Sequence, residues 1–165
     1  MKQLTIAFAL LLALPSFAME PDPLQPIRFL VGQWDSVGQG KPGEATGVAT
    51  FAPSLQGRVI TRTSFAQYPG SRHDDLMIIY AEGAAIRADY YDSEGHVIRY
   101  TVKAEPNRAV FTSDAVPGQP RFRLTYVLAS PGKLDGSFDI APPDAPEKFG
   151  SYLTWTSKLH AGSAR

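Results

Sequence analysis

A two-residue alternation of apolar and polar side chains runs through most of this chain and limits the folds it can adopt. In residues 98–103, isoleucine, tyrosine and valine alternate with arginine, threonine and lysine, and residues 121–128 and 133–140 repeat the pattern. Such alternation is typical of β-strands with one buried face and one solvated face. Turn-forming residues interrupt it about every 8–12 residues, which indicates an all-β domain.

The alternating segments predict ten strands, and helical periodicity is confined to a short proline-interrupted segment at 24–30. The connections are too short for helical crossovers, so consecutive strands should pair antiparallel. We expect strands at 32–39, 45–51, 58–66, 75–80, 85–91, 96–103, 109–113, 121–129, 133–140 and 149–159. A flat sheet of this size would expose its apolar face and edges. We therefore predict an antiparallel up-and-down barrel of roughly ten strands, with a two-sheet sandwich as the alternative.

The first 18 residues have the features of a cleavable signal peptide. Lys2 precedes an apolar run, and Ser16 and Ala18 place small residues before a cut after Ala18. The run is shorter than the roughly 20 residues of a membrane span, although a retained anchor is the alternative. We expect a signal peptide at 1–18, one domain at 19–165, and a periplasmic or secreted protein with no integral membrane span after cleavage.

Composition narrows the possible functions. The chain has 165 residues, 44% of them hydrophobic, and a formal net charge of zero. This composition suits one globular domain and gives no electrostatic reason to expect a nucleic-acid partner. The chain has no cysteine, which excludes disulfides, thiolate metal sites and a cysteine nucleophile.

Gly38, Gly40 and Gly43 form a G-x-G-x-x-G pattern, the spacing found in dinucleotide-binding loops. That function needs a helix that opens directly after the glycines and presents its amide groups to a pyrophosphate. Here the following residues alternate like a strand and soon reach Pro53. We interpret the glycines as part of the first hairpin of a strongly curved sheet.

Gly32 and Trp34 place a G-x-W motif on the first predicted strand, after a short N-terminal segment. This resembles the calycin superfamily, the lipocalins and fatty-acid-binding proteins, and implies that Trp34 closes one end of a barrel. The strand is also similar to that of nitrobindin-like haem-binding barrels, in which further glycines match Gly38 and Gly40 and Ser36 replaces one glycine. The segments HDDLMIIY, IRADYYDSEGHVIRYTV and YLTWTSK resemble uncharacterised bacterial exported proteins.

The aromatic residues of the apolar faces predict a lining for the barrel. We expect Trp34, Phe65, Tyr90, Tyr100, Phe122, Tyr126 and Trp155 to line a ligand site, with Phe51, Phe111 and Phe138 beside them. A ten-stranded barrel is wide enough to leave space for a small molecule. The sequence therefore favours non-catalytic binding of a small hydrophobic or amphipathic ligand. In a sandwich, the same aromatics would be ordinary core of an interaction module.

The three histidines are the remaining candidates for binding a cofactor. The nitrobindin resemblance implies a haem with an axial histidine near the C-terminus, for which His160 is the candidate, with His73 or His96 as substitutes. Without haem, we expect no cofactor. No metal-ligand spacing and no G-x-S-x-G motif occur, so we predict no metal site and no catalytic residue. An enzyme that uses the barrel cavity is the remaining alternative.

The charged residues give weaker indications of function than the aromatic residues and histidines do. Asp89, Asp92 and Glu94 surround a predicted turn, where carboxylates are usually solvated. Arg87 and Arg99 alternate with aliphatic residues and should face outward. An arginine inside a barrel could bind a ligand carboxylate through two hydrogen bonds. Arg62 is the one arginine that the pattern does not place, because its strand, RVITRTSFA, has apolar residues on both faces.

Overall fold

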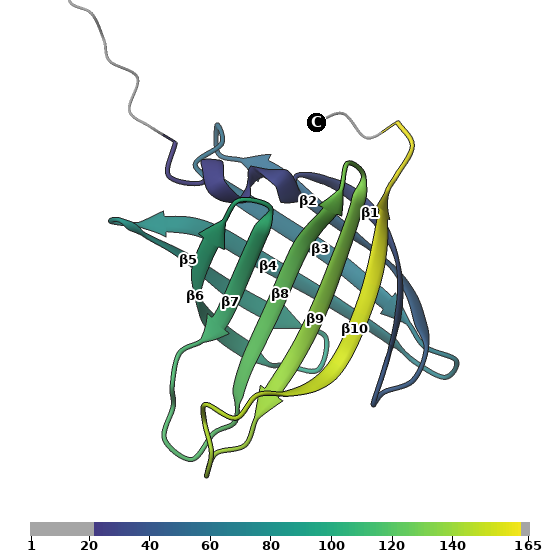
Figure 1. The fold of residues 1–165 in the computed structure, drawn as a ribbon, viewed down its shortest axis with the longest axis vertical. Helices are drawn as coiled ribbons and strands as arrows, with labels where there is room; N and C mark the ends of the chain where they lie inside the picture. The colour runs from purple at the N-terminus through teal and green to yellow at the C-terminus, as the bar shows by residue number, and fades with distance from the viewer. Residues whose placement is uncertain (1–21, 163–165) are drawn as a thin grey trace, which may run out of the picture.

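The computed structural model describes residues 22–162, so the predicted signal peptide lies outside the described residues. A short 3-10 helix, η1 (Gln25–Leu30), precedes ten antiparallel strands (Figure 1). The strands are β1 (Gly32–Gly40), β2 (Ala45–Ser54), β3 (Val59–Gln67), β4 (Arg72–Glu82), β5 (Ala85–Asp92), β6 (Val97–Glu105), β7 (Arg108–Ser113), β8 (Arg121–Ser130), β9 (Lys133–Ala141) and β10 (Gly150–Leu159). The predicted all-β class is confirmed.

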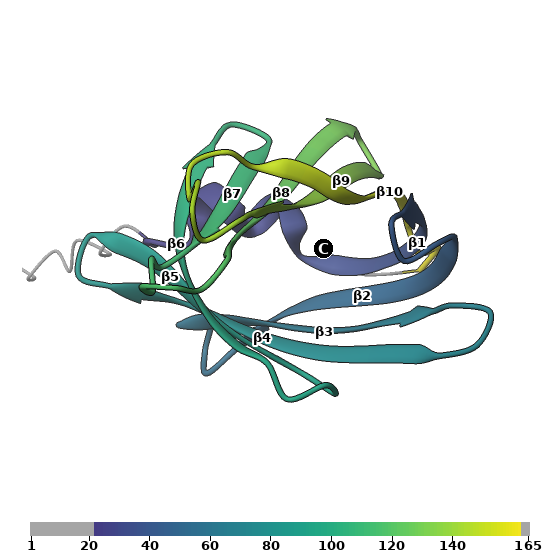
Figure 2. The ribbon, with the colours of Figure 1, turned by 90° about the horizontal axis from the view of Figure 1, so that it is seen from below.

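The strands form a closed up-and-down barrel, as the alternation predicts. Each strand pairs with its neighbours in sequence, and β1 pairs with β10 to close the circle. Trp34 shows the closure directly, because it lies opposite Ala49 on β2 and opposite Leu159 on β10. Figure 2 shows the ring of strands from the end opposite η1. The closed barrel rules out the sandwich alternative.

The largest errors in the predicted strand ends occur at β2 and β4. The prediction begins β4 at Asp75, but the strand starts at Arg72, because His73 and Asp74 continue the alternation and pair with β3. Strand β2 continues past Pro53 to Ser54, where it still pairs with β3. The glycine-rich hairpin is as predicted, since strand β2 and not a helix follows Gly43.

Helix η1 lies across the end of the barrel at which β1 begins, and we call this the closed end (Figure 1). Leu24, Ile27 and Leu30 of this segment are fully buried and belong to the main hydrophobic core. Trp34 is also fully buried, and its indole Nε1 donates a hydrogen bond to the Leu30 carbonyl at 2.7 Å. The position of Trp34 agrees with the plug that the G-x-W motif implies.

Aromatic rings fill the middle of the barrel next to the closed end. The Tyr126 ring packs edge to face against Phe51 at 5.6 Å, Trp155 at 5.7 Å and Phe111 at 5.9 Å between ring centroids. Phe111 in turn packs against Tyr100. Because these rings come from β2, β6, β7, β8 and β10, they reach across the interior from wall to wall. The expected cavity therefore does not extend through this half of the barrel.

Within residues 22–162, no helix is long and apolar enough to cross a membrane.

Candidate ligand-binding site at the open end

The half of the barrel away from η1, which we call the open half, has small side chains on one wall. Strands β1, β2 and β3 point alternate residues inward, and near the closed end these include the buried Trp34, Phe51 and Ile60. Toward the other end, the inward positions of the three strands are Gly38, Gly40, Ala45, Gly47, Ser64 and Ala66, all partly or fully exposed. Side-chain volume thus decreases toward the open end, and solvent reaches these positions.

The opposite wall of the open half is apolar. Phe122 on β8 and Phe138 on β9 stack with 5.7 Å between ring centroids and an interplanar angle of 10°. Both rings are only half-buried, although their strands point them into the barrel. Tyr152 packs edge to face on Phe138, at a bulge where β10 shifts its register. Phe122 and Phe138 therefore give the β8–β9 wall of the open half an apolar and partly exposed surface.

A buried ion pair lies between the aromatic core and the open half. Arg62 on β3 is 6% exposed, and its Nη2 donates to the carboxylate of Asp75 on β4. Its Nη1 donates to the Tyr126 hydroxyl, and Ser64 Oγ donates to the other Asp75 oxygen at 2.6 Å. The guanidinium also lies 5.9 Å from the centroid of the Tyr90 ring. We refer to Arg62, Ser64, Asp75, Tyr90 and Tyr126 as the Arg62 cluster.

The protonation states of this cluster follow from its surroundings. Burial opposes the charge on Arg62, but Asp75 and the tyrosine oxygens hold the pKa of the guanidinium above its ordinary value. Burial raises the pKa of the Tyr126 hydroxyl, and burial together with Asp75 raises that of Tyr90. The cluster therefore contains a cationic guanidinium, which forms an ion pair with Asp75, and neutral tyrosine hydroxyl groups at physiological pH.

One hydrogen-bond donor of the Arg62 cluster is left over. The Nε atom of Arg62 is buried, yet it has no hydrogen-bond partner among residues 22–162. A buried donor without a partner costs about 1–3 kcal/mol, so such atoms are uncommon in native interiors. A ligand that brings an acceptor to this atom would recover that energy.

A chain of polar contacts joins the cluster to the rim of the open end. The Tyr90 hydroxyl lies 2.9 Å from His73 Nε2, and His73 Nδ1 lies 3.2 Å from the Glu94 carboxylate. The Tyr90 hydroxyl also donates to Asp92 at 3.3 Å, and His96 Nδ1 lies 2.9 Å from the same carboxylate. These contacts place polar groups of β4 and β5 at the entrance to the open half.

Asp92 is more buried than its position beside a turn predicts. Its side chain is 4% exposed, and it accepts hydrogen bonds from the backbone amides of Glu94 and His96. Burial opposes its charge, but the hydrogen bonds from His96 and Glu94 outweigh burial and lower the pKa of Asp92.

Most of the predicted lining residues face the interior. Inward-facing members of the predicted set are Trp34, Tyr90, Tyr100, Phe122, Tyr126 and Trp155. Phe65 differs: Ile60, Arg62 and Ser64 take the inward positions of β3, which leaves Phe65 on the outer face. There the guanidinium of Arg72 stacks on its ring at 4.1 Å. The expectation that Phe65 lines the interior is therefore wrong, because strand register overrides its apolar character.

The histidines are distributed over both ends of the barrel. His160 is half-exposed beyond β10 at the closed end, where its Nδ1 lies 2.8 Å from the Asp35 carboxylate. This position does not fit an axial ligand to a haem held inside the barrel. His96 is exposed at the open rim, and His73 is the histidine that faces inward. Among residues 22–162, no group of three or more histidine and acidic side chains could hold a metal ion.

Arg87 faces outward as expected, and its guanidinium contacts Asp114 at 2.5 Å.

The sequence pattern missed the Arg62–Asp75 pair, although the register of the hairpin between their strands contained a signal for it. For β3 and β4, a turn centred on Pro69 and Gly70 sets Ser64 opposite Asp75. That register places an arginine and a carboxylate on the same face of two adjacent strands, two residues apart along the barrel.

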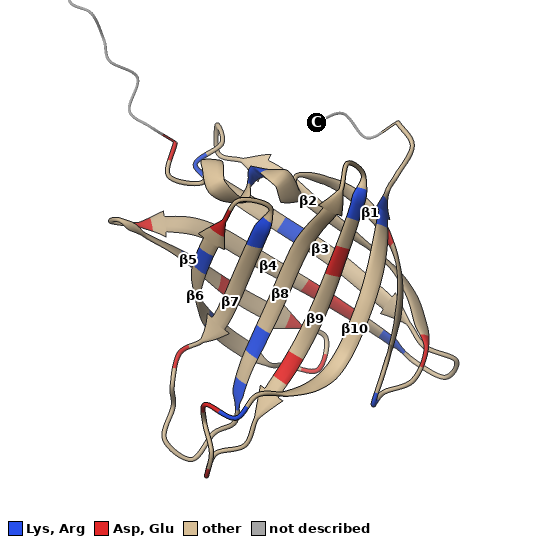
Figure 3. Ribbon diagram, viewed as in Figure 1, with Lys and Arg blue, Asp and Glu red and all other residues tan. Residues whose placement is uncertain are grey.

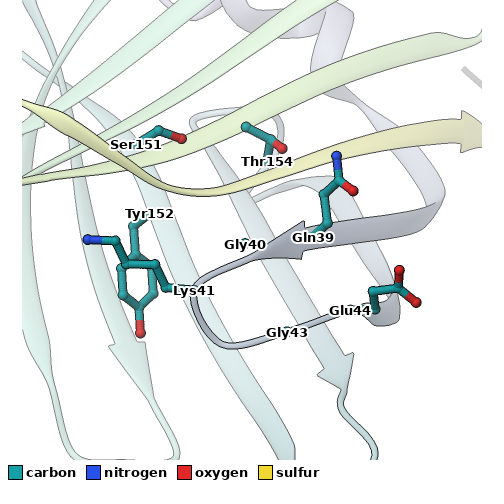
Figure 4. A pocket seen from close by; sticks show the side chains of 8 residues that line it. All are labelled: Gln39, Gly40, Lys41, Gly43, Glu44, Ser151, Tyr152 and Thr154. Atoms are coloured by element: carbon teal, nitrogen blue, oxygen red, sulfur yellow. The ribbon is translucent and has the colours of Figure 1, made fainter.

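A second candidate is a depression at the outer rim, formed by the β1–β2 turn and β10. It has a volume of about 480 Å³, and Gln39, Lys41, Glu44, Tyr152 and Thr154 contribute to its lining. Figure 4 shows the Lys41 side chain beside the Tyr152 ring, and its Nζ lies 6.0 Å from the ring centroid. The depression is open and mostly polar, and its charged groups are ordinary surface residues. It is a weaker candidate than the interior site.

Positive and negative residues are mixed along the strands of residues 22–162. Figure 3 shows lysine and arginine interspersed with aspartate and glutamate along the strands. This distribution agrees with the formal net charge of zero. The interior, with its buried charges, is therefore the more distinctive part of the molecule.

Neither the protein-family models nor the curated protein sequences contain a match to this chain. Solved structures do match its fold. Rv2717c from M. tuberculosis superposes with a TM-score of 0.61 and 12% identity, over 85% of this chain and 98% of that one. The S-type phycobiliprotein lyase CPES from Guillardia theta gives 0.49 and 11%, over 90% of this chain and 99% of that one. EF1p2_mFAP2b, solved with DFHBI bound, gives 0.44 and 11%, over 82% and 97%. At these identities, the likeness to Rv2717c shows a shared barrel fold.

Proposed function

We propose that this protein is an exported barrel that binds a small amphipathic molecule in its open half, without chemical change to the ligand. The observation that carries the proposal is the Arg62 cluster, which places a buried guanidinium and neutral tyrosine hydroxyls at the base of the open half. Barrel ligand sites combine apolar walls with a few such polar groups that orient the ligand. The signal-peptide pattern at 1–18 supports export.

The proposed orientation follows from the two walls. The apolar part of the ligand would lie on the stacked rings of Phe122 and Phe138, opposite the small side chains of β1–β3. Its polar group would point toward Arg62, because an apolar group there would leave the buried polar atoms without partners. The aromatic rings around Tyr126 would form the floor that the ligand rests on.

The experiment that tests this proposal is a titration with the neutral, polarity-sensitive dye N-phenyl-1-naphthylamine. We expect saturable dye fluorescence with the mature wild-type chain and its loss in Ala66→Phe, because Ala66 is an inward residue of the open half. Thr63→Phe is the matched control, since Thr63 lies exposed on the outer face of the same strand and should leave binding unchanged. Equal dye binding by both variants and the wild type, or none by the wild type, would reject the site.

A further inference from the structure

The charges that face the interior limit what the polar group of the ligand can be. Arg62 is the buried cation, and Asp75, whose side chain is 8% exposed, already pairs with it. Asp92 adds a second inward carboxylate with 4% exposure, and Glu94 lies beside the rim. The remaining polar groups near Arg62 are neutral hydroxyls. The guanidinium is therefore fully compensated before any ligand arrives.

A carboxylate ligand would be unfavourable beside this cluster. It would share one guanidinium with Asp75 and leave a negative charge without a counter-ion in an interior that is only partly solvated. An ammonium group would leave Arg62 Nε without a partner, because it offers only donors. An uncharged acceptor avoids both costs and can accept from Arg62 Nε, which no residue within 22–162 satisfies.

We infer that the barrel selects amphipathic ligands whose polar group is an uncharged acceptor, such as a ketone or ester carbonyl, over carboxylates and amines of the same chain length. This inference rests on the proposed function and specifies the ligand class of the same site. The three elements that set the preference are β3, which carries Arg62, β4, which carries Asp75, and β5, which carries Asp92. Tyr90 and Tyr126 keep their protons and provide further neutral contacts around the carbonyl.

Competition against the neutral dye at pH 7 tests the inference with three matched compounds: 2-decanone, decanoate and decylamine. We expect the ketone to displace the dye from the wild-type protein at a concentration about tenfold lower than either charged compound, which corresponds to about 1.4 kcal/mol. Equal displacement by all three, or tighter binding of decanoate, would overturn the inference while the proposed function stands. Failure of the dye and all three compounds to bind would overturn both.

A variant of the counter-ion provides a second, independent test. Asp75→Asn keeps a hydrogen-bond acceptor next to Arg62 but removes the negative charge, so the guanidinium becomes free to compensate a ligand carboxylate. We expect decanoate to gain at least about tenfold in affinity over the wild type. Asp74→Asn is the matched control, because Asp74 lies half-exposed on the outer face beside Arg72 and should change nothing.

The outcomes of this second test are decisive in both directions. If decanoate gains nothing in a folded Asp75→Asn protein, compensation by Asp75 does not set the ligand class and the inference is wrong. Circular dichroism establishes whether the variant folds. If it does not fold, the competition series on the wild-type protein decides the question alone.

Discussion

At the scale of single residues, Gly136 determines how the aromatic core packs. A Cβ atom built on Gly136 would lie 2.1 Å from Cε2 of the Trp155 ring, well inside contact distance. Glycine at this inward position of β9 therefore lets the indole lie flat against the neighbouring strand. That indole packs edge to face on Tyr126, whose hydroxyl accepts from Arg62. The aromatic floor of the proposed site thus depends on the absence of a side chain at Gly136.

We expect Gly136→Ala to lower the free energy of unfolding by about 1–3 kcal/mol, because the added methyl forces Trp155 to move. Urea unfolding followed by tryptophan fluorescence measures the loss. Gly150→Ala is the control, since its added Cβ would meet its nearest neighbour at an ordinary 3.9 Å. Equal stabilities of the two variants would show that Trp155 is not confined as described.

The lowered pKa of Asp92 predicts how the free energy of unfolding depends on pH. Its hydrogen bonds hold its pKa below the ordinary value of 3.8, so the folded state binds its proton less readily than the unfolded chain does. Its stabilising contribution is therefore fully present above pH 3.8, and it is lost as the pH falls below that value and through the lowered pKa of the folded state. Asp22 and Asp114, whose pKa values are lowered by hydrogen bonds from Arg28 and Arg87, act in the same direction.

We expect Asp92→Asn to be less stable than the wild type at pH 7 and to approach it as the pH is lowered below 3.8, where the Asp92 carboxylate is increasingly protonated. Urea unfolding at a series of pH values measures this convergence. Asp144→Asn, a change at an exposed loop position, should follow the wild-type curve throughout. A constant difference between Asp92→Asn and the wild type would contradict the assigned hydrogen bonds.

At the scale of elements, η1 stabilises the barrel by covering its closed end. Ile27 and Leu30 are fully buried there, and the Leu30 carbonyl accepts the hydrogen bond from Trp34. A helix this short is not stable by itself, so it must gain its structure from burial against the barrel. The barrel in turn depends on η1, because without this helix its apolar closed end would be exposed to water.

Ile27→Ala should lower the free energy of unfolding by about 2–5 kcal/mol, the usual cost of removing a buried branched side chain. The measurement is chemical denaturation followed by circular dichroism. Gln25→Ala, an exposed change in the same helix, should have little effect. A small effect of Ile27→Ala would mean that η1 is detachable and does not cap the barrel.

The strands also show what the sequence could predict and what it could not. Alternation located all ten strands, and it is clearest in β6, β8, β9 and β10, which have one apolar and one polar face. Strand β3 lacks this separation: Val59 and Phe65 lie on the outer face, while Ile60 and Arg62 point inward. The apolar character of Phe65 therefore predicts the wrong face for this residue. A buried arginine is stable here because Asp75 pairs with it, and that pairing depends on register between strands, which single-strand patterns do not contain.

At the scale of the whole molecule, the barrel is divided into two halves with different roles. The closed half is filled by aromatic rings, because rings from four strands meet around Tyr126. The open half has small residues on one wall and stacked phenylalanines on the other. The sequence predicted the inward aromatics, but edge-to-face ring packing across the barrel depends on the three-dimensional closure. The Arg62 cluster lies where the two halves meet, so it is the natural end point for a ligand that enters from solvent.

The most direct test of this account is a proton–nitrogen NMR spectrum of the arginine side chains, recorded with and without 2-decanone. The Nε–H signal of Arg62 is assigned by its absence in the doubly changed Arg62→Met, Asp75→Asn protein, which removes both charges of this ion pair together. We predict that saturating ketone shifts this signal strongly, because Nε–H gains an acceptor. A signal that stays in place while surface resonances move would contradict binding in the open half and assign the ligand to the outside of the barrel.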